Sequence, residues 1–126
     1  MDDMLFIVET KEHAKHVFES VKNDLSEIGL SLNKKSHIGN LKNGFTFLNI
    51  YFRLTETGKV KKKLKKKTIS RELKRSKKIL KLFKENKISK FDLIQHFNSW
   101  VGSNMFKMTR NQLRKIKKSL NVFDKK

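Results

Sequence analysis

The chain has 126 residues, which corresponds to one domain or two small ones, and it is 37% hydrophobic and 34% charged. It contains no Cys, which excludes a disulfide framework and a thiolate metal site. The formal net charge is +19, but residues 1–56 hold 7 Lys/Arg and 8 Asp/Glu, whereas residues 57–126 hold 24 and 4. This asymmetry indicates that the C-terminal half faces a polyanion and that the N-terminal half has another role.

The chain begins with a carboxylate pair and an apolar run. Asp2 and Asp3 precede residues 4–8, which are too short to cross a membrane and have the composition of a buried strand. Only three residues precede this strand, so we expect the Asp pair at the tip of a hairpin whose first strand is missing, in a chain that is a fragment. An unpaired edge predicts association or partial disorder around residues 2–8. The N-terminus has no signal-peptide pattern, which predicts a cytoplasmic protein.

A helix is predicted over residues 11–28. Thr10 is a good N-cap, Glu12 lies in the first turn, and Gly29 stands where a C′ glycine belongs. The apolar residues between them recur with the helical period: Ala14, Val17, Phe18, Val21, Leu25 and Ile28.

Extended segments follow this helix. We predict a turn at residues 33–35, a short strand at 36–41, a turn at Asn43-Gly44 and a strand at 45–54. Thr57-Gly58 ends that strand, and Val60 starts a return strand.

The second half changes to helical period. Residues 61–67 are nearly all Lys, and helices are predicted from Thr68 to Glu85, from the capping-box-like Ser89 to Gly102, and after Thr109 as a cap. The shift in charge and period near residue 57 predicts two subdomains, 1–57 and 58–126. Trp100 is expected to anchor the core of the helical part.

Five short motifs follow one another along the chain: Met1-Asp2-Asp3, residues 29–36 (GLSLNKKS), residues 44–49 (GFTFLN), residues 99–102 (SWVG) and residues 111–115 (NQLRK). Together they resemble the C-terminal part of a prokaryotic reverse transcriptase of the group II intron, retron or diversity-generating type. The first looks like the end of the Asp-Asp metal box and the third like the hairpin that grips the primer end. The sequence departs from the family at Asn49, where Gly is usual, and at Ser103, where many relatives have His.

The resemblance implies an α+β fold, in which a truncated polymerase palm of antiparallel strands and one helix precedes a basic three-helix thumb. It implies a fragment of an RNA-directed DNA polymerase, a nucleotidyltransferase that is inactive alone because the fingers and the first palm carboxylate lie upstream in the family. Asp2 and Asp3 would be catalytic ligands of Mg²⁺ in a complete enzyme, and Lys35 would approach the triphosphate. The implied partners are an RNA template, an RNA/DNA duplex and the missing N-terminal polymerase region.

The basic half has a physical meaning of its own, because clustered cations attract nucleic-acid backbones through counterion release. The predicted nucleic-acid-binding residues are Lys61, Lys62, Lys63, Lys65, Lys66, Lys67, Arg71, Lys74, Arg75 and Lys78. A stand-alone, non-enzymatic RNA- or DNA-binding protein is therefore an alternative function. A peripheral membrane protein that uses the helix from Thr68 ranks last, and we expect no membrane partner. His13 and His16 lie three residues apart but are expected to be exposed and not to bind metal.

Overall fold

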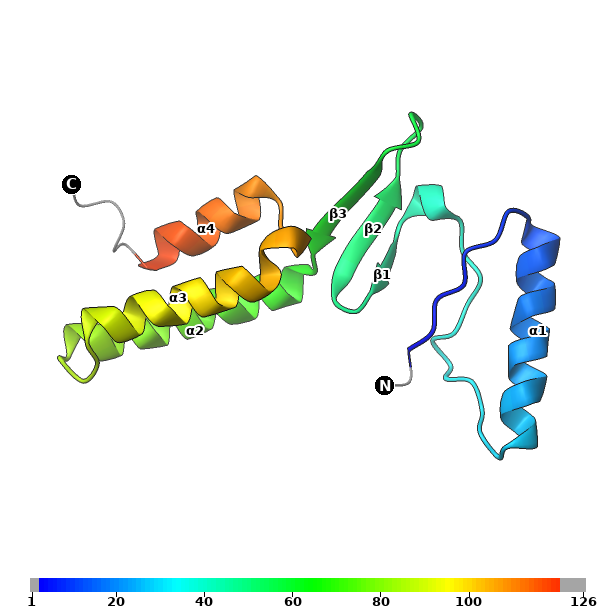
Figure 1. Cartoon of the computed structure of the whole chain (residues 1–126), viewed down its shortest axis with the longest axis horizontal. Helices are drawn as coiled ribbons and strands as arrows, with labels where there is room; N and C mark the ends of the chain where they lie inside the picture. The colour runs from blue at the N-terminus through cyan, green and yellow to red at the C-terminus, as the bar shows by residue number, and fades with distance from the viewer. Residues whose placement is uncertain (1–2, 121–126) are drawn as a thin grey trace.

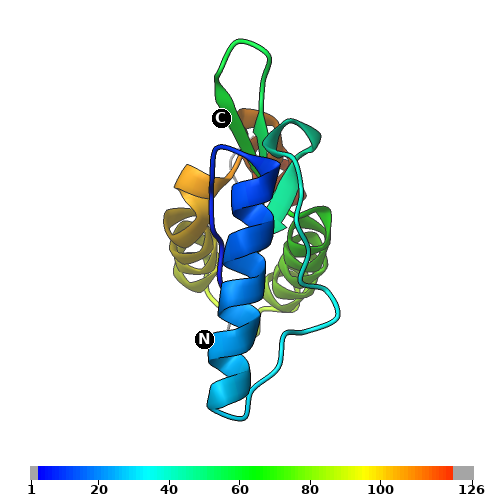
Figure 2. The ribbon, with the colours of Figure 1, turned by 90° about the vertical axis from the view of Figure 1, so that its right-hand side faces the viewer.

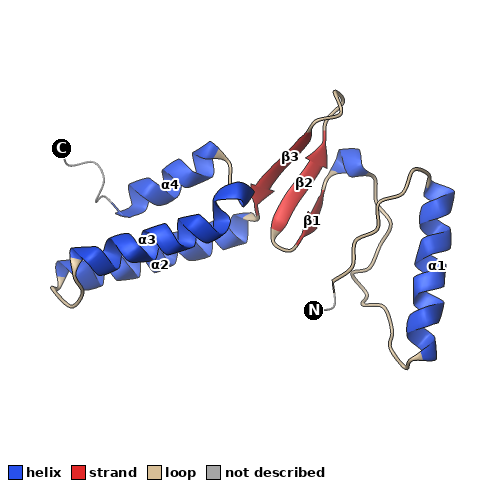
Figure 3. Cartoon of the chain, viewed as in Figure 1, coloured by secondary structure: helices blue, strands red, loops and turns tan. Residues whose placement is uncertain are grey.

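The computed structural model describes residues 3–120, and these form the predicted α+β fold (Figure 1). The elements in chain order are α1 (Lys11–Glu27), η1 (Leu41–Asn43), β1 (Phe45–Phe47), β2 (Ile50–Leu54), β3 (Val60–Leu64), α2 (Lys66–Lys84), α3 (Lys90–Asn104), η2 (Met105–Lys107) and α4 (Arg110–Leu120). The molecule is elongated, with α2, α3 and α4 at one end, the sheet in the middle and α1 at the other end (Figures 1 and 3). Seen from the α1 end, α1 runs across the direction of α2 and α3 (Figure 2).

The three strands form one antiparallel sheet in the order β1-β2-β3. The predicted single strand over residues 45–54 is wrong, because Leu48 and Asn49 turn the chain between β1 and β2. Both residues have positive φ, +48° and +66°, as a tight two-residue hairpin turn requires. Asn adopts this left-handed conformation more readily than most residues. The predicted return strand from Val60 is confirmed as β3.

Two other predicted strands are wrong, since residues 4–8 and 36–41 form no strand. Residues 4–8 are extended but have no hydrogen-bonded strand beside them, and Phe6 and Ile7 are 55% and 64% exposed. Strand formation depends on a partner that local composition does not supply. Residues 36–40 are irregular, and the chain then tightens into η1, where the Asn40 side chain accepts a hydrogen bond from the backbone N–H of Lys42.

The N-terminal helix is confirmed to within one residue at its end. The Thr10 hydroxyl accepts a hydrogen bond from the backbone N–H of His13, and Gly29 has a φ of +75° just beyond the helix. None of the α1 residues is buried. The apolar side of the helix is half-buried, so packing around α1 is looser than in an enclosed core.

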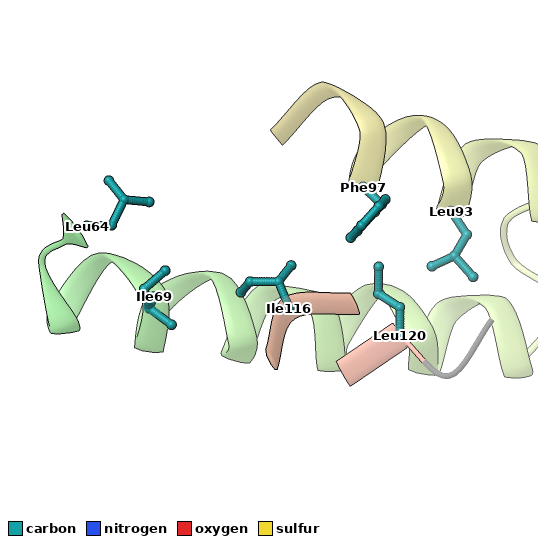
Figure 4. Close-up of a cluster of buried hydrophobic side chains, with 6 residues drawn as sticks. All are labelled: Leu64, Ile69, Leu93, Phe97, Ile116 and Leu120. Atoms are coloured by element: carbon teal, nitrogen blue, oxygen red, sulfur yellow. The ribbon is translucent and has the colours of Figure 1, made fainter. Parts of the chain in front are cut away.

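The core lies at the opposite end, where α2, α3 and α4 pack together. Its buried residues are Leu64, Ile69, Leu93, Phe97, Ile116 and Leu120 (Figure 4). Trp100 packs against this cluster, which confirms its predicted role as a core anchor. The helix predicted to end at Gly102 continues to Asn104, because an exposed glycine inside a helix weakens it without terminating it. Strand β3 delivers Leu64 into this core, so the sheet and the bundle share one apolar centre.

Acid is expected to weaken the start of α3. The Ser89 hydroxyl and backbone N–H both donate to the Asp92 carboxylate, and these bonds hold the pKa of Asp92 below its ordinary value. A depressed pKa in the folded state gives stability that is present above the unfolded pKa, near 4, and is lost as pH falls through the folded pKa. We expect Asp92→Asn to have a lower free energy of unfolding in urea at neutral pH than the unmodified chain. Between about pH 5 and pH 2, the free energy of unfolding should fall less for Asp92→Asn than for the unmodified chain. An unchanged acid profile would contradict this.

Gly44 is required where the sheet begins. Its φ is +79°, and a Cβ atom built there would overlap the hydroxyl end of the Tyr51 ring. We expect Gly44→Ala to lower the free energy of unfolding by about 3 kcal/mol, because left-handed strain and a steric overlap add together. Gly58→Ala is the matched control: its φ is +76° but no atom lies near its Cβ position. Urea unfolding should show a loss of only ~1 kcal/mol there, and equal losses at both positions would refute the role of Tyr51.

Candidate nucleic-acid interface

The register of the sheet separates two chemically different faces. Residues directly opposite each other in an antiparallel sheet point to the same side, and successive residues alternate. Tyr51 is opposite Lys63, and Arg53 is opposite Lys61, so these four residues share one side with Thr46. We call this side the open face. The other side, the apolar face, holds Phe45, Phe47, Ile50, Phe52, Leu54, Val60, Lys62 and Leu64.

The apolar face carries the packing of the sheet. The Phe45 and Phe52 rings stack with centroids 5.5 Å apart. Leu5 and Ile7 of the N-terminal segment join this face at a hollow of about 200 Å³. Its lining is apolar except for Arg53, whose side chain reaches its edge although Arg53 starts from the open side of the strand. Leu64 extends the same face into the helical core, where Ile50 also packs. Most of the apolar packing of the sheet is therefore on the apolar face, and on the open face Tyr51 lies against Gly44.

The open face is cationic and holds one aromatic ring. The Lys63 ammonium lies 5.1 Å from the centre of the Tyr51 ring, a cation–π distance. Arg53 and Lys61 are both exposed and directly opposite each other, and like charges at such a position destabilise a hairpin. The sequence predicted Lys61, Lys62 and Lys63 as one cluster, but the strand pleat sends Lys62 to the opposite side.

Helix α2 presents the densest positive charge. Its 19 residues include nine cations, all exposed: Lys66, Lys67, Arg71, Lys74, Arg75, Lys77, Lys78, Lys81 and Lys84. Its single carboxylate, Glu72, is buried on the side that faces the core. Six of the ten predicted binding residues lie on this helix, Lys65 stands at its N-cap position, and each of these seven is exposed.

Helix α4 adds a second cationic surface that the predicted binding residues did not include. A shallow hollow of about 340 Å³ is lined by Arg110, Leu113, Arg114, Lys117 and Lys118. Its four cations recur at helical spacing, and α4 packs against α2. The signal was present in the sequence, as a run of Arg and Lys around Leu113 and Ile116, but it was weaker than the lysine run before α2. In contrast, α3 carries only Lys90 and Asp92 as charged residues.

One glutamine holds the cationic helices to the sheet. The Gln112 side chain donates to the Leu64 carbonyl at 2.8 Å and accepts from the Leu64 N–H at 3.1 Å. It also accepts from the backbone N–H of Thr109, whose hydroxyl in turn caps α4 as predicted. This arrangement joins the start of α4 to the end of β3.

A polar contact inside the bundle was not predicted from the sequence. His96 Nε2 of α3 lies 3.0 Å from Glu72 Oε1 of α2, and the two side chains are 12% and 5% exposed. Within the described residues, the buried Ser76 hydroxyl has no hydrogen-bond partner. The available signal was Glu72 itself, a carboxylate at the helical spacing of the apolar residues Ile69 and Leu73. Its partner is 24 positions away, and local patterning does not reveal such a pair.

Two of the three predicted catalytic residues, Asp3 and Lys35, lie within the described chain. Asp2 lies outside the described residues, Asp3 is exposed, and the N-terminal segment runs between the sheet and α1 (Figure 1). Lys35 is exposed in the predicted turn between α1 and η1, where its backbone N–H is bonded to the Asn33 side chain. Between residues 3 and 120, no group of three or more His, Asp or Glu side chains could hold a metal ion. The described residues thus do not make a complete Mg²⁺ site. His13 and His16 are exposed, as expected.

Comparisons with protein-family models, curated proteins and solved structures gave no match. Within residues 3–120, no helix combines the length and apolar character needed to cross a membrane.

Proposed function

We propose that this protein binds nucleic acid through the phosphate backbone, with α2 as the main contact and α4 beside it. The observation that carries this proposal is the composition of α2, which exposes nine cations while its only carboxylate is buried. A surface of this kind gains affinity by releasing counterions from a polyanion. A helix of 19 residues is ~28 Å long, which is enough to follow most of one turn of a duplex backbone.

The expected ligand is a duplex recognised by shape, such as an RNA duplex or an RNA/DNA hybrid. The cations of α2 are mostly lysines, which act as point charges toward phosphates and give little base discrimination. A-form duplexes are themselves recognised by phosphates and 2′-OH groups. Binding should therefore vary little with sequence.

Fluorescence anisotropy with a labelled RNA/DNA hybrid of about 16 base pairs tests the proposal. If six or more phosphates are contacted, the logarithm of the association constant should fall with the logarithm of salt concentration with a slope of about −5. A shuffled hybrid of equal length should bind with similar affinity. A shallow slope, or no binding near 50 mM salt, would defeat the proposal.

A second candidate is that this binding surface is the thumb of a reverse transcriptase, preceded by part of its palm. The observation that favours it is the hairpin of β1 and β2, which begins just after Gly44 and turns at Leu48-Asn49. The resemblance implies a hairpin at this motif, followed by a basic three-helix unit. In that role Asp2 and Asp3 would belong to a magnesium site that only a complete enzyme has, and Lys35 to its substrate side.

This second candidate is tested by complementation. The fingers and first palm segment that the resemblance assigns upstream are supplied in trans, and extension of a DNA primer on an RNA template is measured. Extension should need both parts and should be lost with Asp2→Ala, while the Asp2→Ala chain still binds the hybrid. Normal extension by the Asp2→Ala complex would reject the polymerase role and leave the binding function standing.

A further inference from the structure

We propose that the open face of the sheet is a separate contact site for unpaired nucleotides, in which a base stacks on Tyr51 and the strand phosphates meet Arg53, Lys61 and Lys63. The inference rests on the proposed nucleic-acid binding and deepens it, because it assigns single-stranded nucleic acid to a surface distinct from α2 and α4. The juxtaposition that carries it is an aromatic ring among three cations on one side of a short sheet.

The arrangement of charges on the open face does not stabilise the fold. Arg53 and Lys61 are like charges directly opposite each other, and the apolar core of the sheet is on the other side. A local arrangement that opposes stability without a packing benefit is typical of a functional surface. A polyanion that lies along β2 and β3 would remove this repulsion, so the hairpin gains stability when it is occupied.

The Tyr51 ring is held in a fixed position by its surroundings. Its hydroxyl end lies against Gly44, where any side chain would overlap it, and its hydroxyl group is 3.5 Å from the Asn43 carbonyl. The Lys63 ammonium covers the ring in the free protein. A lysine stem is flexible and its ammonium prefers a phosphate, so a bound strand draws Lys63 off the ring and leaves room for a base.

The ring selects unpaired nucleotides over duplexes. Bases inside a duplex are stacked on each other and do not offer a face to a side chain, whereas a splayed single strand does. Stacking of one base on an aromatic side chain contributes about fivefold to a hundredfold in affinity and depends little on which base is present. Charge alone would attract both duplexes and single strands, and it would bind an abasic strand as well as a strand that carries bases.

The test compares three ligands: an oligouridylate of about ten nucleotides, an abasic oligomer of the same length, and the hybrid duplex. We expect Tyr51→Leu to weaken oligouridylate binding at least fivefold and to leave the other two within about twofold. Tyr51→Phe, which keeps the ring and loses only the hydroxyl group, should bind oligouridylate like the unmodified chain. An equal loss on the abasic oligomer, or no loss on oligouridylate, would overturn the inference.

A direct readout avoids any folding defect in the Tyr51→Leu variant. Tyr51 is the single tyrosine of the chain, so its ring protons can be followed in the unmodified protein by NMR after selective labelling. Stacking should shift these resonances upfield with oligouridylate but not with the abasic oligomer. Binding to all three ligands without this shift would reject the stacking site alone, whereas binding to none of them would reject the proposed function as well.

Discussion

The variant R71Q/K74Q/R75Q/K78Q, which neutralises the middle of α2, is expected to bind the RNA/DNA hybrid on the order of 10³-fold more weakly at about 100 mM salt. Each phosphate contact contributes ~0.9 to the slope of affinity against salt, so four lost contacts should make the slope shallower by about 3 to 4. All four side chains are exposed, and none is part of the buried core. The variant should therefore fold normally, and removing repulsion among neighbouring cations favours the helix slightly.

The matched control removes the same charge from the other end of the molecule. The variant K11Q/K15Q/K22Q/K34Q changes four exposed lysines of α1 and the loop that follows it. If α2 is the contact surface, this control should bind within about threefold of the unmodified chain and keep nearly the same slope, since remote charges act only through the screened field. Equal losses in the two variants would mean that binding follows net charge and not the α2 surface.

Gln112→Ala is expected to lower the free energy of unfolding by about 3 kcal/mol. The substitution removes the partner of both backbone groups of Leu64 and of the Thr109 N–H. Leu64 is only 2% exposed, so water reaches its backbone poorly, and an unsatisfied buried group costs roughly 1–3 kcal/mol. Urea unfolding followed by circular dichroism measures the change.

Asn111→Ala provides the control for this position. Asn111 is the neighbouring residue on the exposed side of α4, and its replacement should change stability by less than about 0.5 kcal/mol. Gln112→Glu keeps the acceptor but loses the donor to the Leu64 carbonyl, so its stability should fall between those of the unmodified chain and Gln112→Ala. A loss at Gln112 no larger than at Asn111 would show that the contact with β3 does not hold the bundle to the sheet.

The features predicted correctly from the sequence are those with a local cause. Thr10 and Gly29 bracket α1, and Ser89 with Asp92 starts α3, because caps act on backbone groups within one turn. The turn at Leu48 and Asn49 was missed because neither residue is Gly, and the positive φ angles that make the turn are not evident from these residue types. The strand predicted at residues 4–8 failed for a related reason, since strands need partners from elsewhere in the chain.

The candidate interface likewise has one part that could be predicted from the sequence and one part that could not. The cations of α2 are visible in the sequence as a run whose exposure follows from helical period, so their positions could be predicted. The open face could not, because it exists only after the register pairs Tyr51 with Lys63 and Arg53 with Lys61. The contact between Glu72 and His96 likewise depends on how two helices pack. Whether these surfaces bind nucleic acid stays a prediction.

Helix α1 has no buried residue, whereas the bundle encloses the core. The apolar side of α1 is only half-buried, and elements with few buried apolar contacts open locally at a lower free energy than the core of a protein. Its amide protons should accordingly exchange with deuterium far sooner than those of the three-helix unit. The C-terminal part should therefore be the more stable part of the chain, and the N-terminal part should unfold locally at a lower free energy. A partner that covered α1 would stabilise the N-terminal part alone.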